Sequence, residues 1–196
     1  MTNAVSPESI KQIFTEARTH RAWLDREVGD DVLSKIFEVA KWGPTSVNCL
    51  PARFLFLKSS TAKAELLPAL AGSNVQQVQA APVTAVIAFD EKFYDELPAL
   101  FTAFDAKSLF LGNPALSAET AFRNSALQGA YFMLAARALG LDVGPMSGFD
   151  NAKVDEIFFS GTSWKSNFLC NIGYGDPAKL FPRGPRLSFD QAAKIA

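Results

Sequence analysis

The longest helical pattern in the chain, from Ala115 to Leu139, most constrains how the chain can fold. Apolar residues recur there at helical spacing, and Gly140 follows as a helix stop. The spacing predicts one apolar stripe, formed by Leu127, Tyr131, Leu134 and Ala138. Small residues make the middle slender, namely Ser125, Ala126, Gly129 and Ala130. Because small residues let another backbone approach closely, this helix is expected either at the centre of the fold or at a subunit contact.

Shorter patterns surround this helix. Four more helices are predicted: one capped by Ser6 and running to about Arg18, one from Asp30 or Asp31 to Gly43, a short one capped by Thr61, and one starting at Asp150. Strands are predicted at 54–57, 82–89 and 166–174. With 196 residues, 48% of them hydrophobic, the chain is long enough for one sizeable core, so 1–196 is taken as a single domain. The order of elements favours an α/β or α+β class without choosing between them.

Two segments lack clear periodicity. Aromatic residues accumulate between Phe93 and Phe110, and two interpretations stay open for residues 91–114: a mobile cover over a site, or a packed helical insertion. The tail, 176–196, holds three prolines and little helical signal before Phe189. Such a tail is either disordered or clasped by another surface.

Composition and charge exclude several classes of protein. The net charge of -1 gives no overall field that would attract nucleic acid or an acidic membrane surface. The longest apolar run, Ala80 to Phe89, is far shorter than the roughly 20 residues of a membrane helix. The first residues do not resemble a secretory signal, so a cytoplasmic protein with no membrane partner is expected. Cys49 and Cys170 are far apart in sequence, which favours two reduced thiols.

Common catalytic motifs are missing from the sequence. His20 is the single histidine, and no cysteine cluster accompanies it, so a zinc site or a Ser-His-Asp triad is not expected. The string "GYGDPA" (173–178) fits a dinucleotide pattern on paper, but Pro177 and the proline-rich tail prevent the helix that such a site needs. Gly173 and Gly175 are better interpreted as the end of a strand.

Basic and small polar residues form five separated groups. Near the two chain ends, guanidinium groups could jointly hold a phosphate, although each arginine alone is more typical of a solvated surface. Asn74 and Gln77, three residues apart, would share a helix face, and their amides could form hydrogen bonds with the edge of a ring. "GPMSGF" (144–149) predicts a turn whose backbone donors point into a cleft, and the loop after Gly43 could approach a flat ligand.

These groups, taken in order, resemble the nitroreductase family of flavin mononucleotide (FMN) enzymes. The resemblance is carried by "RTH", "KWGPTSVNCLPAR", "ETAFRNS", "RALGLDVGPMSGFD", "KSN", "NIGYGD" and "PRLSF", which span nearly the whole chain. Within that family the strings look most like the pyrimidine-utilisation branch assigned as malonic semialdehyde reductase. Ala17, Leu50 and Ala52 depart from residues that are frequent in the family.

The resemblance implies an α+β, nitroreductase-like FMN-binding fold with a mixed central sheet flanked by helices. It also implies an intertwined homodimer with the cofactor at the interface and the tail wrapped over the partner. The implied activity takes hydride from NADH or NADPH through FMN to a small acceptor, and reduces malonic semialdehyde to 3-hydroxypropionate. A broad nitroaromatic or quinone reductase, and a flavin-binding protein without turnover, are the alternatives. No catalytic side chain is implied, because the flavin carries the chemistry.

Carried over by position, the resemblance assigns cofactor-binding roles to sixteen residues. Phosphate and ring contacts near the N-terminus fall to Arg18, Thr19, His20 and Arg21, and the closing phosphate contacts to Arg183 and Arg186. The loop that reaches the partner's flavin is matched by Pro44, Thr45, Ser46 and Asn48. Contacts to the pyrimidine edge fall to Asn74 and Gln77, and the backbone turn beside the ring is formed by Pro145, Met146, Ser147 and Gly148.

Overall fold

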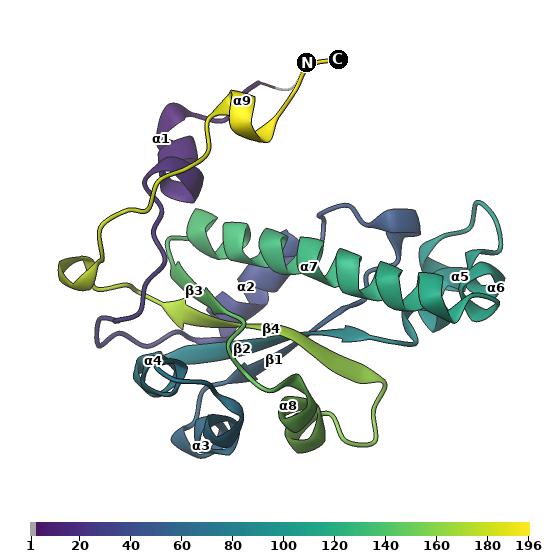
Figure 1. Cartoon of the computed structure of the whole chain (residues 1–196), viewed down its shortest axis with the longest axis horizontal. Helices are drawn as coiled ribbons and strands as arrows, with labels where there is room; N and C mark the ends of the chain where they lie inside the picture. Colours follow the sequence, from purple (N-terminus) through teal and green to yellow (C-terminus); the bar gives the residue numbers. More distant parts are fainter. Residues whose placement is uncertain (1–2) are drawn as a thin grey trace.

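A four-stranded sheet organises the computed structural model, which describes residues 3–196 (Figure 1). The strands are β1 (Ala52–Leu57), β2 (Val83–Asp90), β3 (Asp142–Met146) and β4 (Trp164–Gly173), in the order β1-β2-β4-β3. Each neighbouring pair is antiparallel, whereas the sequence led us to expect a mixed sheet. The reason is that β2 and β3, which run in the same direction, are separated in the sheet by the oppositely directed β4. A parallel pairing occurs as the isolated bridge of Thr19 and Val143. The α+β class is confirmed.

Helices cover both faces of this sheet (Figure 1). On one face lie α2 (Asp30–Ala40) and α7 (Pro114–Ala138); on the other lie α3 (Ser60–Leu66), α4 (Asn74–Ala80) and α8 (Asn151–Phe158). The shorter elements are α1 (Pro7–Ile10), η1 (Lys11–Thr15), η2 (Ser46–Asn48), η3 (Leu67–Ala69), η4 (Phe93–Glu96), α5 (Leu97–Leu100), α6 (Ala106–Leu111), η5 (Pro177–Lys179) and α9 (Phe189–Ala192). Strand β2 is mainly apolar from Val83 to Phe89 because both faces of its buried part are covered, with Ile87 in the α7 core and Val86 in the opposite one.

The predicted helices form, with corrections at their ends. The first helix stops at Thr15 in a π-helical turn, short of Arg18. Thr61 is not the cap of α3; the hydroxyl of Ser59 accepts the Ala62 N–H at 3.1 Å because Ser59 has the extended backbone that a cap requires. Strand β3 was not predicted, since a five-residue strand that contains Gly144 and Pro145 carries little strand signal.

The predicted apolar stripe of α7 is wrong. Leu127 is 42% exposed, and Ala138 is exposed as well. The buried face instead carries mainly small and polar residues, among them Thr120, Asn124, Ser125, Gln128 and Gly129. These residues let α7 lie directly on the sheet, so the slender middle does mark a central helix.

The segment 91–114 is a packed helical insertion, which was one of the two alternatives. Phe93 and Phe110 are buried, and their rings meet edge to face at 5.0 Å between centroids. Leu97 and Cys49 join the same apolar cluster, so the insertion is anchored to the loop before β1. Whether the segment also moves as a cover stays a prediction.

The C-terminal tail runs back past α1 with most of its surface exposed (Figure 1). Phe181 is 65% exposed, Leu187 70% and Phe189 62%. Apolar side chains at such exposure favour a surface that is covered by another molecule. The wrapping of a partner subunit, which the sequence led us to expect, stays a prediction.

The close contact of α7 with the sheet gives a test of the core. A Cβ placed on Gly129 would lie 2.5 Å from Cζ of Phe168 and 3.4 Å from Cγ2 of Ile87. Gly129→Ala is therefore expected to destabilise the fold by about 1–3 kcal/mol through overpacking, despite the better helix propensity of alanine. Thermal unfolding should report this loss. Gly184→Ala, at an open position, is the control, and equal stability of the two variants would contradict this account.

Candidate functional site

The two basic groups at opposite ends of the chain meet in one cavity of about 560 Å³, here named the arginine cavity. Its lining has five arginines and no carboxylate, and consists of Phe14, Thr15, Ala17, Arg18, Thr19, Arg21, Arg137, Phe181, Pro182, Arg183, Gly184 and Arg186. Like charges gathered without a counter-charge repel one another. The cavity is therefore suited to a polyanionic group such as a phosphate.

Backbone contacts hold the two chain ends together around this cavity. Arg18 donates to the carbonyl oxygen of Phe181, and Arg183 Nη2 donates to that of Ala17 at 3.0 Å. The guanidinium carbon of Arg21 lies 5.3 Å from the centre of the Phe181 ring. Arg186 donates to carbonyl groups of its own turn. Each guanidinium has five N–H donors, so most of them stay free for a ligand.

His20 lies apart from this cavity. Its side chain is buried, and Nε2 is 3.4 Å from Oδ1 of Asp142. Oδ2 of Asp142 accepts the Gly175 N–H at 2.9 Å, and the His20 N–H bonds the Val143 carbonyl at 3.2 Å. His20 thus fastens the segment that carries Arg18, Thr19 and Arg21 to the ends of β3 and β4, instead of facing the cavity itself.

Arg137 belongs to the cavity, and the sequence did not single it out. It lies in the last turn of α7, where its Nη1 donates to the carbonyl of Ile13 at 3.2 Å. Its Nε is buried without a partner. Burial lowers the pKa of this guanidinium, and the positive charge of Arg183 lowers it further. A bound anion would relieve both effects. A basic residue at the C-terminal end of the longest helix was the available signal.

The predicted ring-edge residues lie beside the predicted turn. Asn74 Nδ2 donates to the carbonyl of Gly148 at 2.8 Å, and a Cβ on Gly148 would lie 2.8 Å from that nitrogen, so a larger residue there would displace the Asn74 amide. Gln77 Nε2 is 3.4 Å from Oδ1 of Asn74, which confirms that both amides share one face of α4. Pro145, Ser147 and Gly148 are exposed, and Met146 ends β3 half-buried.

Strand β3 connects the arginine cavity to this turn. Val143 pairs with Thr19 at the cavity, and Gly148 lies five residues further along the chain. At the rise of an extended strand, five residues span roughly 16 Å. The surface therefore offers cationic groups at one end and neutral amide and backbone groups at the other, an arrangement that fits an elongated ligand with one anionic end.

The loop after α2 is held against the middle of α7. The Ser46 N–H donates to Oδ1 of Asn124 at 2.9 Å, and Asn48 Nδ2 donates to the Leu100 carbonyl at 2.9 Å. Thr45 Oγ1 accepts the Leu50 N–H at 3.3 Å, and the carbonyl of Pro44 accepts a hydrogen bond from the Tyr131 hydroxyl at 3.1 Å. Asn124 precedes Arg137 by thirteen residues, about 20 Å along the helix. Within one chain this loop does not join the arginine cavity.

The cysteines offer no reactive group to this site. Burial raises the pKa of the Cys49 thiol to about 11 and that of Cys170 to about 12. Residues 3–196 hold no cluster of three histidine, cysteine or acidic side chains suited to a metal ion. Within the same range, none of the helices combines the length and apolarity needed to cross a bilayer.

Fold and site together define an α+β protein with a binding surface for a long, anionic ligand. The sequence matches the nitroreductase family over residues 14–174, and the chain therefore belongs to that family. A protein of Burkholderia lata with the provisional name NADH dehydrogenase/NAD(P)H nitroreductase is 57% identical over 191 residues, which are 97% of this chain and 98% of that protein.

Solved structures share the fold at low sequence identity. The provisionally described nitroreductase ydfN of Bacillus subtilis superposes with a TM-score of 0.86 at 20% identity and covers 97% of this chain and 100% of its own. A provisionally described nitroreductase of Exiguobacterium sibiricum, solved with FMN, has a TM-score of 0.84 at 24% identity over 100% of both chains. These findings confirm the family, the fold and the class of enzyme. The branch and the individual site residues stay predictions.

The raised pKa of Cys49 gives a chemical test of the loop. Because about one thiol in a thousand would be ionised at pH 8, a thiol-specific disulfide reagent is expected to leave Cys49 unmodified until the protein unfolds. In denaturant both cysteines should react at once. The thiol introduced by Ser34→Cys, at an exposed position of α2, is the control. Reaction of Cys49 as fast as that control thiol would show that the loop opens readily.

Proposed function

We propose that this protein is an FMN-dependent oxidoreductase that takes hydride from NADH or NADPH and passes it to a small acceptor. The observation that carries the proposal is the arginine cavity, joined by β3 to the Asn74–Gly148 contact. FMN has a dianionic phosphate at one end and a planar ring with amide-like edges at the other. When bound, the flavin would supply the hydride transfer, so no nucleophilic side chain is needed.

The residues present fit FMN in charge and in type of donor. Arg18, Arg183 and Arg186, with Arg21 and Arg137, would hold the phosphate, and its charge would offset the repulsion among them. Asn74 and Gln77 would bond the pyrimidine edge, while the stretch from Pro145 to Gly148 would lie along the ring. His20 would act through the backbone it fastens, by keeping Thr19 next to β3.

We propose that two copies of the chain complete each site. In one copy the residues Pro44, Thr45, Ser46 and Asn48 lie away from the arginine cavity, so they could face a flavin only across a subunit contact. The exposed tail supports the same arrangement, since Phe181, Leu187 and Phe189 would be covered by a partner. The outer face of α7, with Phe122 at 55% exposure, adds apolar surface for such a contact.

Two acceptors merit direct comparison. The order of the sequence motifs supports malonic semialdehyde, which would be reduced to 3-hydroxypropionate. The name of the Burkholderia lata relative, which includes NAD(P)H nitroreductase, supports a nitro compound as the acceptor instead, and a quinone is the other alternative. Comparing kcat/KM for malonic semialdehyde, a nitroaromatic and a quinone separates these alternatives, because the physiological class should be preferred by a wide margin.

Purification tests the proposal as a whole. The protein is expected to be yellow, with about one FMN per chain and a dimeric mass by light scattering. Under anaerobic conditions, NADH or NADPH should bleach the flavin spectrum. A colourless preparation that refuses added FMN, or a strictly monomeric particle, would refute the proposal. Bound flavin that neither nicotinamide bleaches would favour a binding protein without turnover.

Arg186 tests the phosphate contacts. Arg186→Ala is expected to weaken FMN binding by roughly 10- to 100-fold, because a charge-assisted hydrogen bond contributes about 1.5–3 kcal/mol. Quenching of flavin fluorescence measures the dissociation constant, and circular dichroism checks the fold. Lys153→Ala, on α8 at the opposite face of the sheet and paired with Asp150, is the control for loss of an exposed charge. Unchanged FMN affinity in the Arg186 variant would remove that residue from the phosphate site.

A further inference from the structure

An ion pair joins β1 and β2 at the end of the sheet where the 44–50 loop enters. Arg53 Nη2 lies 2.9 Å from Oδ2 of Asp90, and the two side chains are 23% and 13% exposed. Among the ion pairs within residues 3–196, this is the one in which both side chains are less than a quarter exposed. Reduced contact with water makes such a pair stronger and more sensitive to the loss of either partner than a surface pair.

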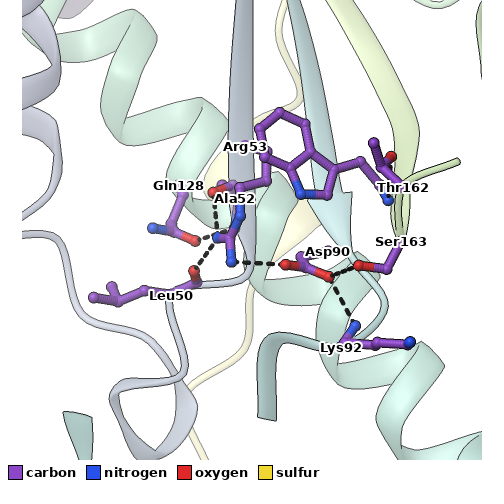
Figure 2. A network of polar contacts seen from close by, with 9 residues as sticks. Leu50, Ala52, Arg53, Asp90, Lys92, Gln128, Thr162 and Ser163 are labelled. Atoms are coloured by element: carbon purple, nitrogen blue, oxygen red, sulfur yellow. Dashed lines mark hydrogen bonds and ion pairs between the residues drawn. The ribbon is translucent and has the colours of Figure 1, made fainter. Parts of the chain in front are cut away.

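Asp90 gathers donors from three parts of the chain. Besides Arg53, its carboxylate accepts the Lys92 N–H at 2.9 Å and the Ser163 hydroxyl at 2.6 Å, as Figure 2 shows. The Asp90 N–H donates to the carbonyl of Pro51 at 2.9 Å. Since Lys92 precedes η4, the carboxylate fixes the point at which the 91–114 segment leaves the sheet.

Arg53 forms hydrogen bonds at the junction of the 44–50 loop and β1. Its Nη1 donates to the carbonyl of Leu50 at 3.1 Å and to that of Ala52 at 3.0 Å (Figure 2). Leu50 ends the 44–50 loop. One guanidinium therefore bridges the end of that loop and the carboxylate that fixes the 91–114 segment.

The backbone of the loop needs such support. Val47, Asn48 and Leu50 have positive φ angles of 47°, 52° and 39°, a conformation that residues other than glycine adopt only where their surroundings hold them. Asn48 also reaches the second segment directly, through its bond to the Leu100 carbonyl. Polar contacts thus tie loop and segment together at two points, the Arg53–Asp90 pair and the Asn48–Leu100 bond, in addition to the apolar cluster that contains Cys49.

We infer that Arg53 and Asp90 are a positioning pair that sets the 44–50 loop and the 91–114 segment as one unit around the acceptor. The inference rests on the proposed function, in which this loop faces the partner's flavin. The pair touches neither cofactor nor acceptor; it acts through the Leu50 carbonyl and the Lys92 N–H. It lies on the strands, so it can hold both segments in place whether or not a ligand is bound.

Two substitutions weaken this bridge in different ways. Asp90→Asn keeps an oxygen that can accept from Lys92 and Ser163 but removes the charge that Arg53 faces. Arg53→Lys keeps a charge near Asp90 but loses the planar fork that reaches Leu50 at the same time. Lys58→Gln is the control, because it breaks the pair of Lys58 with Asp30, 2.5 Å apart, at the opposite end of β1.

The test uses FMN-loaded protein with menadione as the acceptor and whichever nicotinamide bleaches the flavin. Either substitution is expected to raise the KM for menadione about tenfold, with FMN affinity and kcat within about twofold of wild type. The double variant should cost no more than the larger single change, because both residues act as one unit. Hydrogen exchange should rise in residues 44–50 and 92–100 together, with or without flavin, and Lys58→Gln should change neither segment.

Several outcomes would overturn the inference. A folded Asp90 variant with unchanged KM, or faster exchange in one segment without the other, would show that the pair does not couple them. Additive effects in the double variant would show that the two residues act separately. If the Asp90→Asn variant does not fold, the KM for menadione and the hydrogen exchange of the Arg53→Lys variant test the inference. If wild-type protein binds no FMN, the proposed function fails, while the exchange measurement still decides whether the two segments are coupled.

Discussion

Close packing of α7 on the antiparallel sheet is the contact on which the rest of the molecule depends. Gly129 allows the helix to approach Phe168 and Ile87. The same buried face carries Asn124 and Gln128, whose amide oxygens would be costly to bury without donors. Their partners are the backbone N–H groups of Ser46 and Ala52, at 2.9 and 2.8 Å. The helix therefore fixes both the core and the path of the chain into β1, and so the position of the loop between them.

The polar character of that face explains where sequence reasoning succeeded and failed. Long periodic segments such as α2 and α7, and the β-branched run of β2, were predicted because their patterns are local. The buried stripe of α7 was assigned to the wrong face, since hydrophobic periodicity marked Leu127 while the real contact uses Gly129 and Gln128. The buried face of α7 is the one whose amide side chains bond a distant loop. No local sequence pattern reveals that bonding. Strand β3 was not predicted for a related reason: its pairing with β4 overrides its weak strand propensity.

In the candidate site, too, the residues of local motifs could be predicted, whereas contacts that depend on tertiary packing could not. The meeting of Arg18 with Arg183 could be anticipated, because each belongs to a recognisable local motif and a phosphate needs several cations. The position of Arg137 in the cavity could not be predicted, because it depends on how η1 packs beside the end of α7. The link of Arg53 to Asp90 likewise requires the register of β1 on β2, with Arg53 opposite Ala88. His20 belongs to the segment that carries Arg18 and Arg21, but it is buried beside Asp142, where it fastens that segment to β3 and β4.

The distance between the two halves of the site carries an argument about assembly. A flat ligand held, as proposed, at the arginine cavity and the Asn74–Gly148 contact would lie against an exposed turn, and one of its faces would be left to water. The 44–50 loop, strained and tied to α7, is too firmly held to cross about 20 Å of helix and cover that face. In the proposed dimer, a second copy would supply its own loop to that face. The same contact would bury exposed apolar side chains of the tail and of the outer face of α7, so completing the site and stabilising the assembly become one event.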